Sequence, residues 1–219
     1  MTLGLTLAVD GSTYAGSVAL IREREVVAER QLPPAAKPGR EGRAERFMPM
    51  LVECLRDAKV EPSSLARIVC GEGPGSFTSL RVAASIAKGL AVGTGIPLFP
   101  VSSLLLIVAG EEVQGGRWYA VLPAMRGEFF AALFDKSGES IEQIAPTSVI
   151  AEERLGDEAD HAHANIIEPG RIPHARGVAR VIDSIIAAGE ADIDAWEPMY
   201  GRLAEAQVKW EAAHGRPLV

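Results

Sequence analysis

The segment GEGPGSFTSLR, residues 71–81, joins a short apolar run to a long helical pattern. Gly73 and Gly75 permit backbone angles that other residues rarely adopt, and Ser76 or Thr78 can cap a following helix. A strand, a glycine turn and a helix N-terminus together bring unpaired N–H groups to one place, which favours anion binding. The segment lacks a Walker lysine and the GxGxxG spacing. A structural turn is therefore the favoured interpretation, with anion binding as the alternative.

The pattern on both sides of this segment predicts an alternation of strands and helices. In chain order the predicted elements are strands at 3–9, 17–21 and 26–32, a helix at 44–58, a strand at 68–70, a helix at 77–93 and a strand at 96–101. The first three strands are joined by short turns and predict a meander. Three meander strands followed by crossover helices are typical of half an actin-like ATPase unit, the α/β fold of hexokinase and Hsp70.

The rest of the chain repeats this theme in shorter form. We expect a helix at 103–112, a second meander at 118–122, 129–135 and 140–144, a helix at 147–155, a strand at 164–167 and a helix at 175–189. The sequence thus predicts two lobes, 1–102 and 103–191, of an actin-like ATPase (ASKHA, ribonuclease H-like) fold. The tail, 192–219, is predicted to be extended and to gain order on docking.

The helices at 44–58 and 77–93 carry apolar side chains on more than one side. Only a narrow polar stripe interrupts the second helix, and small residues recur at Ala83, Ala87 and Ala91. These surfaces predict a docking face for a second protein, and the alternative is that the second half of the chain covers them. The residues assigned to this face are Glu45, Met48, Val52, Arg81, Ala83, Ala84, Ala87, Lys88 and Ala91.

Asp10, followed by Gly11, Ser12 and Thr13, resembles the first phosphate loop of actin-like ATPases. Such enzymes need a second acidic turn, and the corresponding turn at 123–127 contains no carboxylate. An actin-like ATPase or small-molecule kinase that uses Asp10 and the turn at 73–78 is therefore kept as the alternative function. Its nucleotide or anion site would comprise Asp10, Ser12, Gly73, Gly75 and Ser76. No residue is predicted to be catalytic, and a peptidase has no motif in its favour.

Composition excludes several classes of protein. The formal net charge of −7 disfavours a protein that holds a nucleic acid alone, because phosphates require a concentrated basic face. No pair of the four histidines has the helical spacing of a metal site. The apolar window at 82–109 is broken by Gly and Pro, so no membrane span is expected. Cys54 and Cys70 lie in apolar patterns and indicate buried thiols in a reducing cytoplasm.

Four segments carry a family resemblance. They are AVDGST at 8–13, RAERFMP at 43–49, GEGPGSFTSLRVAASIAKGLA at 71–91 and IPLFPVSSL at 96–104. Together they resemble the TsaB family, also called YeaZ, and the long central motif is the most specific of them. The tail around Glu197, Pro198, Tyr200 and Arg202 is also similar.

The resemblance implies a role in tRNA modification. A TsaB protein pairs with TsaD, which transfers a threonylcarbamoyl group to N6 of adenosine 37 in tRNAs that decode ANN codons. TsaB is then a non-catalytic scaffold and activator, contacts tRNA only indirectly, and forms a homodimer when TsaD is absent. The helices matching 44–58 and 77–93 form the pairing face, and TsaE acts on the TsaB–TsaD pair. No cofactor is required, with ATP or ADP at the partner interface as the alternative.

Overall fold

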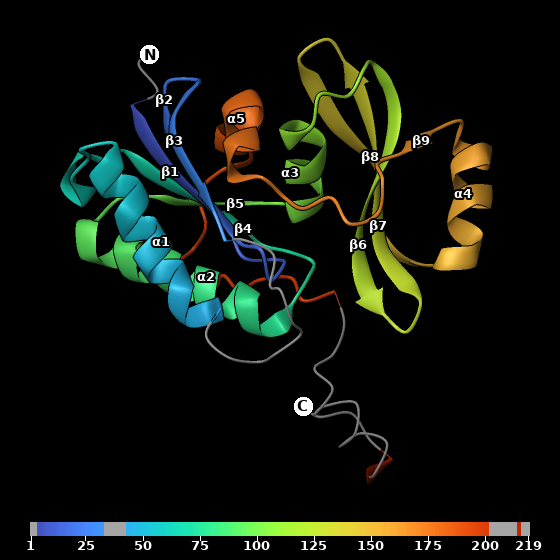
Figure 1. The fold of residues 1–219 in the computed structure, drawn as a ribbon, viewed down its shortest axis with the longest axis horizontal. Coiled ribbons are helices and arrows are strands. Elements are labelled where there is room, and N and C mark those ends of the chain that lie inside the picture. Colours follow the sequence, from blue (N-terminus) through green and yellow to red (C-terminus); the bar gives the residue numbers. More distant parts are fainter. Residues whose placement is uncertain (1–3, 33–42, 202–213, 216–219) are drawn as a thin grey trace.

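The structure is a computed structural model that describes residues 4–32, 43–201 and 214–215, with only the backbone described at 43–45. Figure 1 shows two lobes, each built on a β-sheet, with helices α3 (Ser103–Gly110) and α5 (Val178–Ala188) between the sheets. The predicted mixed α/β architecture is confirmed.

The first sheet contains five strands in the order β3-β2-β1-β4-β5. The strands are β1 (Leu5–Asp10), β2 (Ser17–Arg22), β3 (Glu25–Gln31), β4 (Arg67–Gly71) and β5 (Leu98–Val101). Strands β1 to β3 form the predicted antiparallel meander, whereas β4 runs parallel to β1 and β5 parallel to β4. The carboxyl ends of β1 and β4 therefore meet at one edge of the sheet, where Asp10 faces the glycine turn.

Helices α1 (Arg43–Asp57) and α2 (Phe77–Thr94) cover one face of this sheet (Figure 1). Their inner sides complete an apolar core in which Leu51 of α1 and Ala87 of α2 join side chains from the sheet, such as Leu7. The short helix η1 (Pro62–Ser64) leads into β4. Pro49 lies inside α1, which continues beyond it to Asp57.

The opposite face is covered by α3, α5 and the short helix η3 (Ala175–Gly177). Leu106 of α3 packs in the core of the first sheet, while Leu104 and Ile107 pack in the core of the second. Because α3 is buried on both sides, it is the main apolar link between the sheets. The predicted boundary assigned α5 to the second lobe, yet α5 packs against the first sheet.

The second sheet has the order β8-β7-β6-β9. Its strands are β6 (Gly116–Met125), β7 (Glu128–Ser137), β8 (Ser140–Ala151) and β9 (Asn165–Ile166). The meander β6-β7-β8 is antiparallel and β9 runs parallel to β6, so the arrangement repeats that of β1 to β4. Helix α4 (Leu155–Ala162) contributes Leu155 to the outer core. The internal duplication expected from the sequence is thus visible in the topology.

Two local predictions are corrected. The helix expected at 147–155 is wrong over its first half, because β8 continues to Ala151 before the short helix η2 (Glu152–Arg154) and α4. β-Branched residues at 147, 149 and 150 favour this strand. The tail is expected to gain order only on docking, but as far as Gly201 it packs on the first lobe of the chain itself. Beyond Gly201 the structure describes only residues 214–215. Among the helices described, none combines the length and apolarity needed to cross a bilayer.

Candidate functional site

Asp10 ends β1 and lies buried, with 1% of its surface exposed. Its Oδ1 accepts hydrogen bonds from the backbone N–H of Ser12, at 2.9 Å, and from the Ser12 hydroxyl, at 2.7 Å. Its Oδ2 accepts a hydrogen bond from the Ser103 hydroxyl at 2.6 Å. Burial raises the pKa of Asp10, and the bonds from Ser103 and Ser12 oppose this rise. Both carboxylate oxygens are therefore engaged by donors of the protein itself.

The glycine turn is fixed by hydrogen bonds to two other segments. The N–H of Gly73 donates to Ser103 Oγ at 3.1 Å, and the N–H of Ser103 donates to the Gly73 carbonyl at 2.9 Å. The N–H of Ser76 donates to the Ser12 carbonyl at 2.7 Å. Ser103 is the residue that sequence reasoning missed, and its only signal was its place at the start of an apolar helix.

The close approach of these segments explains why glycine is required at two positions. A Cβ on Gly71 would collide with the Asp10 carboxylate, and a Cβ on Gly75 would collide with the Ser12 carbonyl. Ser76 is the N-cap of α2 but makes no side-chain capping bond; its hydroxyl lies 3.2 Å from that of Ser79.

The structure thus brings together the predicted nucleotide or anion set, Asp10, Ser12, Gly73, Gly75 and Ser76. The N–H groups of Ser12, Gly73 and Ser76 donate to acceptors inside the protein. An anion bound through these N–H groups would have to displace those bonds. The geometry is that of a hydrogen-bonded junction between β1, the glycine turn and α3.

The docking face needs correction on α2. Ala83, Ala87 and Ala91 lie in the core between α2 and the first sheet, and Ala84 is also buried. These four residues cannot line a contact with a second protein, because their own chain already covers them.

A different row of small residues lies on the outer side of α2. Ser85, Gly89 and Gly93 are exposed at i, i+4 and i+8, and a Cβ built on either glycine meets no atom within 4 Å. On α1, Met48 and Val52 are 43% and 49% exposed, as the sequence predicts. We call Met48, Val52, Ser85, Gly89, Val92 and Gly93 the α1–α2 face; Val92 is 69% exposed.

The charged residues predicted for the docking face flank this surface. Arg81 is exposed and its guanidinium lies 5.0 Å from the centre of the Phe77 ring. Lys88 is half-buried, with its ammonium 5.6 Å from the centre of the Trp196 ring. The backbone of Glu45 lies in α1, and its side chain is outside the described part of the structure.

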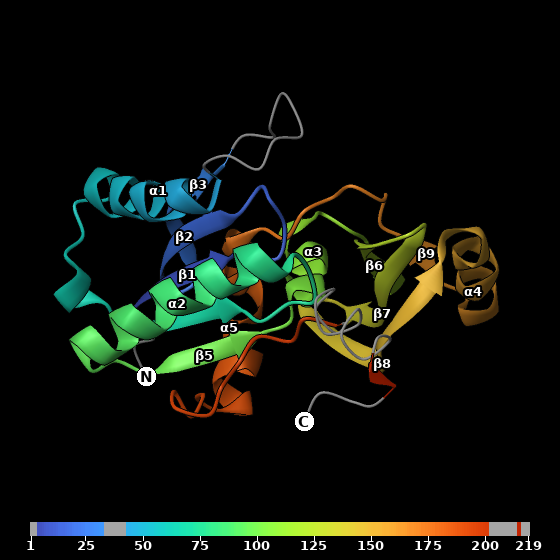
Figure 2. The ribbon, with the colours of Figure 1, turned by 90° about the horizontal axis from the view of Figure 1, so that it is seen from below.

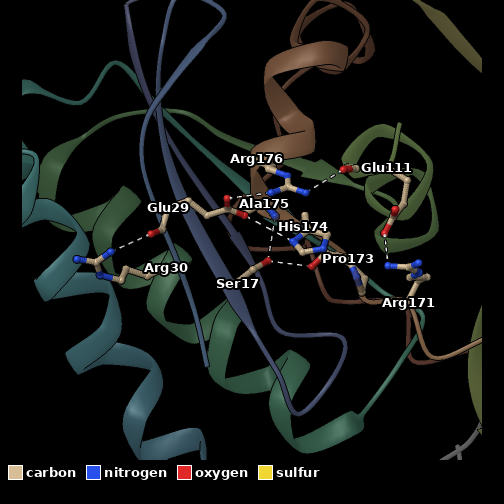
Figure 3. Close-up of polar contacts among 10 residues, drawn as sticks. Ser17, Glu29, Arg30, Glu111, Arg171, Pro173, His174, Ala175 and Arg176 are labelled. Carbon is tan, nitrogen blue, oxygen red and sulfur yellow. Dashed lines mark hydrogen bonds and ion pairs between the residues drawn. The ribbon is translucent and has the colours of Figure 1, made fainter. Parts of the chain in front are cut away.

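A second polar cluster was not predicted (Figure 3). The Ser17 hydroxyl donates to the Pro173 carbonyl at 3.0 Å and accepts from the N–H of Ala175 at 2.9 Å. The sequence offered no signal for this cluster, because its partners lie far apart in the chain. It joins β2 to the segment that leads into α5.

Glu29 of β3 takes part in the same cluster (Figure 3). Arg176 donates to its carboxylate at 3.3 Å, and His174 Nδ1 lies 3.5 Å away, at ion-pair distance. His174 and Arg176 lower the pKa of Glu29, against the opposing effect of burial. Within the described ranges, no group of three or more His, Cys, Asp or Glu residues could hold a metal ion.

Known proteins resemble the chain over most of its length. A family model described as "TsaD: tRNA N6-adenosine threonylcarbamoyltransferase" matches residues 40–173. The "tRNA threonylcarbamoyladenosine biosynthesis protein TsaB" of Bacillus subtilis (strain 168) is 29% identical over 229 residues, covering 93% of this chain and 96% of the relative. The protein of the same name from Escherichia coli (strain K12) is 32% identical over 154 residues, covering 67% of this chain and 64% of the relative.

The solved structure described as "YeaZ from Pseudomonas aeruginosa" has the same fold. Its TM-score is 0.74 at 24% sequence identity, and the match covers 90% of this chain and 100% of that chain. Both proteins therefore share the actin-like ATPase architecture expected from the meander, helix and parallel-strand order. The chain belongs to the family that the matching model describes and, within it, to the TsaB (YeaZ) proteins.

Proposed function

We propose that this chain is the non-catalytic partner of a TsaD subunit in the synthesis of threonylcarbamoyladenosine at adenosine 37 of tRNAs that decode ANN codons. Its relatives from Bacillus subtilis and Escherichia coli are named for threonylcarbamoyladenosine biosynthesis. In this proposal the chain pairs with TsaD through the α1–α2 face and forms a homodimer through the same face when TsaD is absent. TsaE acts on the pair, tRNA is contacted indirectly, and pairing needs no cofactor.

The exposed outer side of the α1–α2 layer is the observation that carries the proposal. The inner sides of both helices are already packed on the first sheet, so Met48, Val52 and Val92 have no role in the core. Exposed large apolar side chains on an outer surface are a feature of protein contacts. Gly89 and Gly93 add a stretch of bare helix backbone that a second helix can approach closely.

The arrangement around Asp10 supports a partner role over the ATPase alternative. A metal-bound nucleotide at Asp10 would compete with the protein's own donors, because the two carboxylate oxygens already accept three hydrogen bonds. The turn at 123–127, which occupies the equivalent place in the second meander, has no carboxylate. The junction therefore serves as the rigid base from which α2 starts.

The test compares two glycine-to-arginine variants. Gly89→Arg places a long cation on the α2 side of the α1–α2 face, whereas Gly156→Arg places the same side chain on α4. Both glycines lie in helices and are exposed, and a Cβ added to either one meets open space. Because glycine is a poor helix former, replacing either one with arginine should stabilise its helix by about 0.8 kcal/mol. Both variants are therefore expected to keep the fold.

The measurement is the mass in solution, by light scattering, of each variant alone and mixed with TsaD of the same organism. We expect Gly156→Arg to pair like the parent chain and Gly89→Arg to stay monomeric and to bind TsaD at least about tenfold more weakly. If the parent chain does not pair with TsaD at all, the proposed function is wrong. If Gly89→Arg pairs normally, the placement of the face is wrong.

A further inference from the structure

After α5 the chain returns along the first lobe (Figures 1 and 2). The N–H of Ala191 donates to the carbonyl of Leu98 at 2.7 Å, at the free edge of β5. Further on, the N–H of Met199 donates to the carbonyl of Glu72, also at 2.7 Å. We call residues 191–201 the strap. In Figure 2 this orange-to-red segment runs alongside β5 and then toward the second sheet.

Side chains hold the strap against the first lobe. Trp196 packs on the core beneath α2, and its backbone N–H donates to the Asp192 carbonyl at 2.7 Å in a local turn. The ring of Tyr200 lies with its centre 4.5 Å from that of Phe77, at the start of α2. The strap is therefore fixed at both ends of its path and along its length.

The end of the strap lies between the two lobes. A Cβ on Gly201 would lie 2.9 Å from Pro74 Cβ, in the glycine turn of the first lobe, and 2.5 Å from Phe130 Cε1, on β7 of the second sheet. A Cβ on Gly73 would collide with the Met199 carbonyl. Both glycines have positive φ angles, of +71° and +105°. The strap is thus packed so closely between the glycine turn and the second sheet that there is no room for one added carbon atom at Gly201.

This contact adds a mechanical constraint that α3 does not supply. Helix α3 lies between the sheets and is only about 12 Å long. Sheets that pack on one short helix can still shift relative to each other by small sliding motions. A contact outside the helix blocks such motion. We propose that the strap is a second restraint between the lobes, wedged at Gly201 between Pro74 and Phe130, and that it fixes the angle between the two sheets.

The experiment measures the distance between the lobes with two spin labels. Labels on Ser63→Cys, in the first lobe, and Asp160→Cys, on α4, lie at exposed positions. The native thiols do not compete: Cys54 and Cys70 are buried, and burial raises the pKa of Cys54 to about 11. Labelled chain is diluted with unlabelled chain, so that only distances within one molecule are recorded.

Gly201→Ala is compared with Gly95→Ala. The φ angles of the two glycines are +71° and +70°, so alanine has to adopt the same positive φ at both positions, but a Cβ on Gly95 touches nothing. We expect Gly201→Ala to shift or broaden the interlobe distance by more than about 2 Å, and Gly95→Ala to match the parent.

A chain ended after Trp196 provides a second variant in case Gly201→Ala does not fold. It keeps Trp196 in the core but removes the bond to Glu72 and the wedge at Gly201. The same shift or broadening is expected. If the shortened chain keeps the parent distance distribution, or if Gly201→Ala folds and keeps it, the strap does not set the angle and the proposal is overturned.

Discussion

Asp10 illustrates how one residue can serve structure where its position suggests catalysis. It stands where an actin-like ATPase has a phosphate-loop carboxylate, yet it binds Ser12 and Ser103 through short hydrogen bonds. Burial of a carboxylate costs free energy, and the hydrogen bonds from its donors compensate this cost. The sequence could predict the proximity of Asp10 to the glycine turn, but it could not predict Ser103, which enters the junction from another helix.

Glu29 supplies a pH-dependent prediction at the same scale. Its pKa is lowered in the folded chain by His174 and Arg176, so the charged form stabilises the fold. This contribution is complete above the unfolded pKa, about 4.3, and is lost as the pH falls through the lower folded value. We expect Glu29→Gln to lower the free energy of unfolding by about 1 kcal/mol at pH 7. Below about pH 4 the difference in this free energy between Glu29→Gln and the parent chain should become smaller.

Urea unfolding measured from pH 3 to pH 7 checks this expectation, with Glu25→Gln, exposed on the same strand, as the control. The control should follow the parent chain at every pH. A constant difference between Glu29→Gln and the parent over the whole range would contradict the role assigned to the Glu29 charge.

Helix α2 shows what an apolar pattern can and cannot decide at the scale of one element. Its existence and length follow from the sequence, but it carries two rows of small residues, Ala83, Ala87 and Ala91, and Ser85, Gly89 and Gly93. Two positions along a helix correspond to about 200° around its axis, so the rows lie on nearly opposite sides. Which row meets the sheet depends on packing, and the structure places the alanines inside.

This assignment can be tested with two leucine substitutions on α2. Ala87→Leu adds three carbon atoms to a fully packed core and should lower the free energy of unfolding by about 1–3 kcal/mol. Ser85→Leu projects outward and should change it by no more than about 0.5 kcal/mol. Thermal and urea unfolding of both variants provide the comparison. Equal losses in the two variants would mean that the burial assigned to α2 is wrong.

At the scale of the whole molecule, the sequence predicted the two meanders and their order, because local periodicity determines them. It did not predict the strap or the packing of α5 on the first sheet, since both depend on contacts between segments far apart in the chain. The same holds for Ser17 and Pro173, which lie 156 positions apart in the chain and meet at the start of β2. The family resemblance implied a docking face on these two helices, and the structure shows which residues of that predicted face are buried.

Amide hydrogen exchange tests the proposed pairing with TsaD most directly. It is measured by mass spectrometry for the chain alone, kept monomeric by dilution, and for the chain saturated with TsaD. We predict slower exchange in the exposed parts of α1 and α2, around residues 48–53 and 85–94, and unchanged exchange in α4 at 155–162. Protection confined to α4 or β8, or absent from α1 and α2, would contradict the central claim that the α1–α2 face binds the partner.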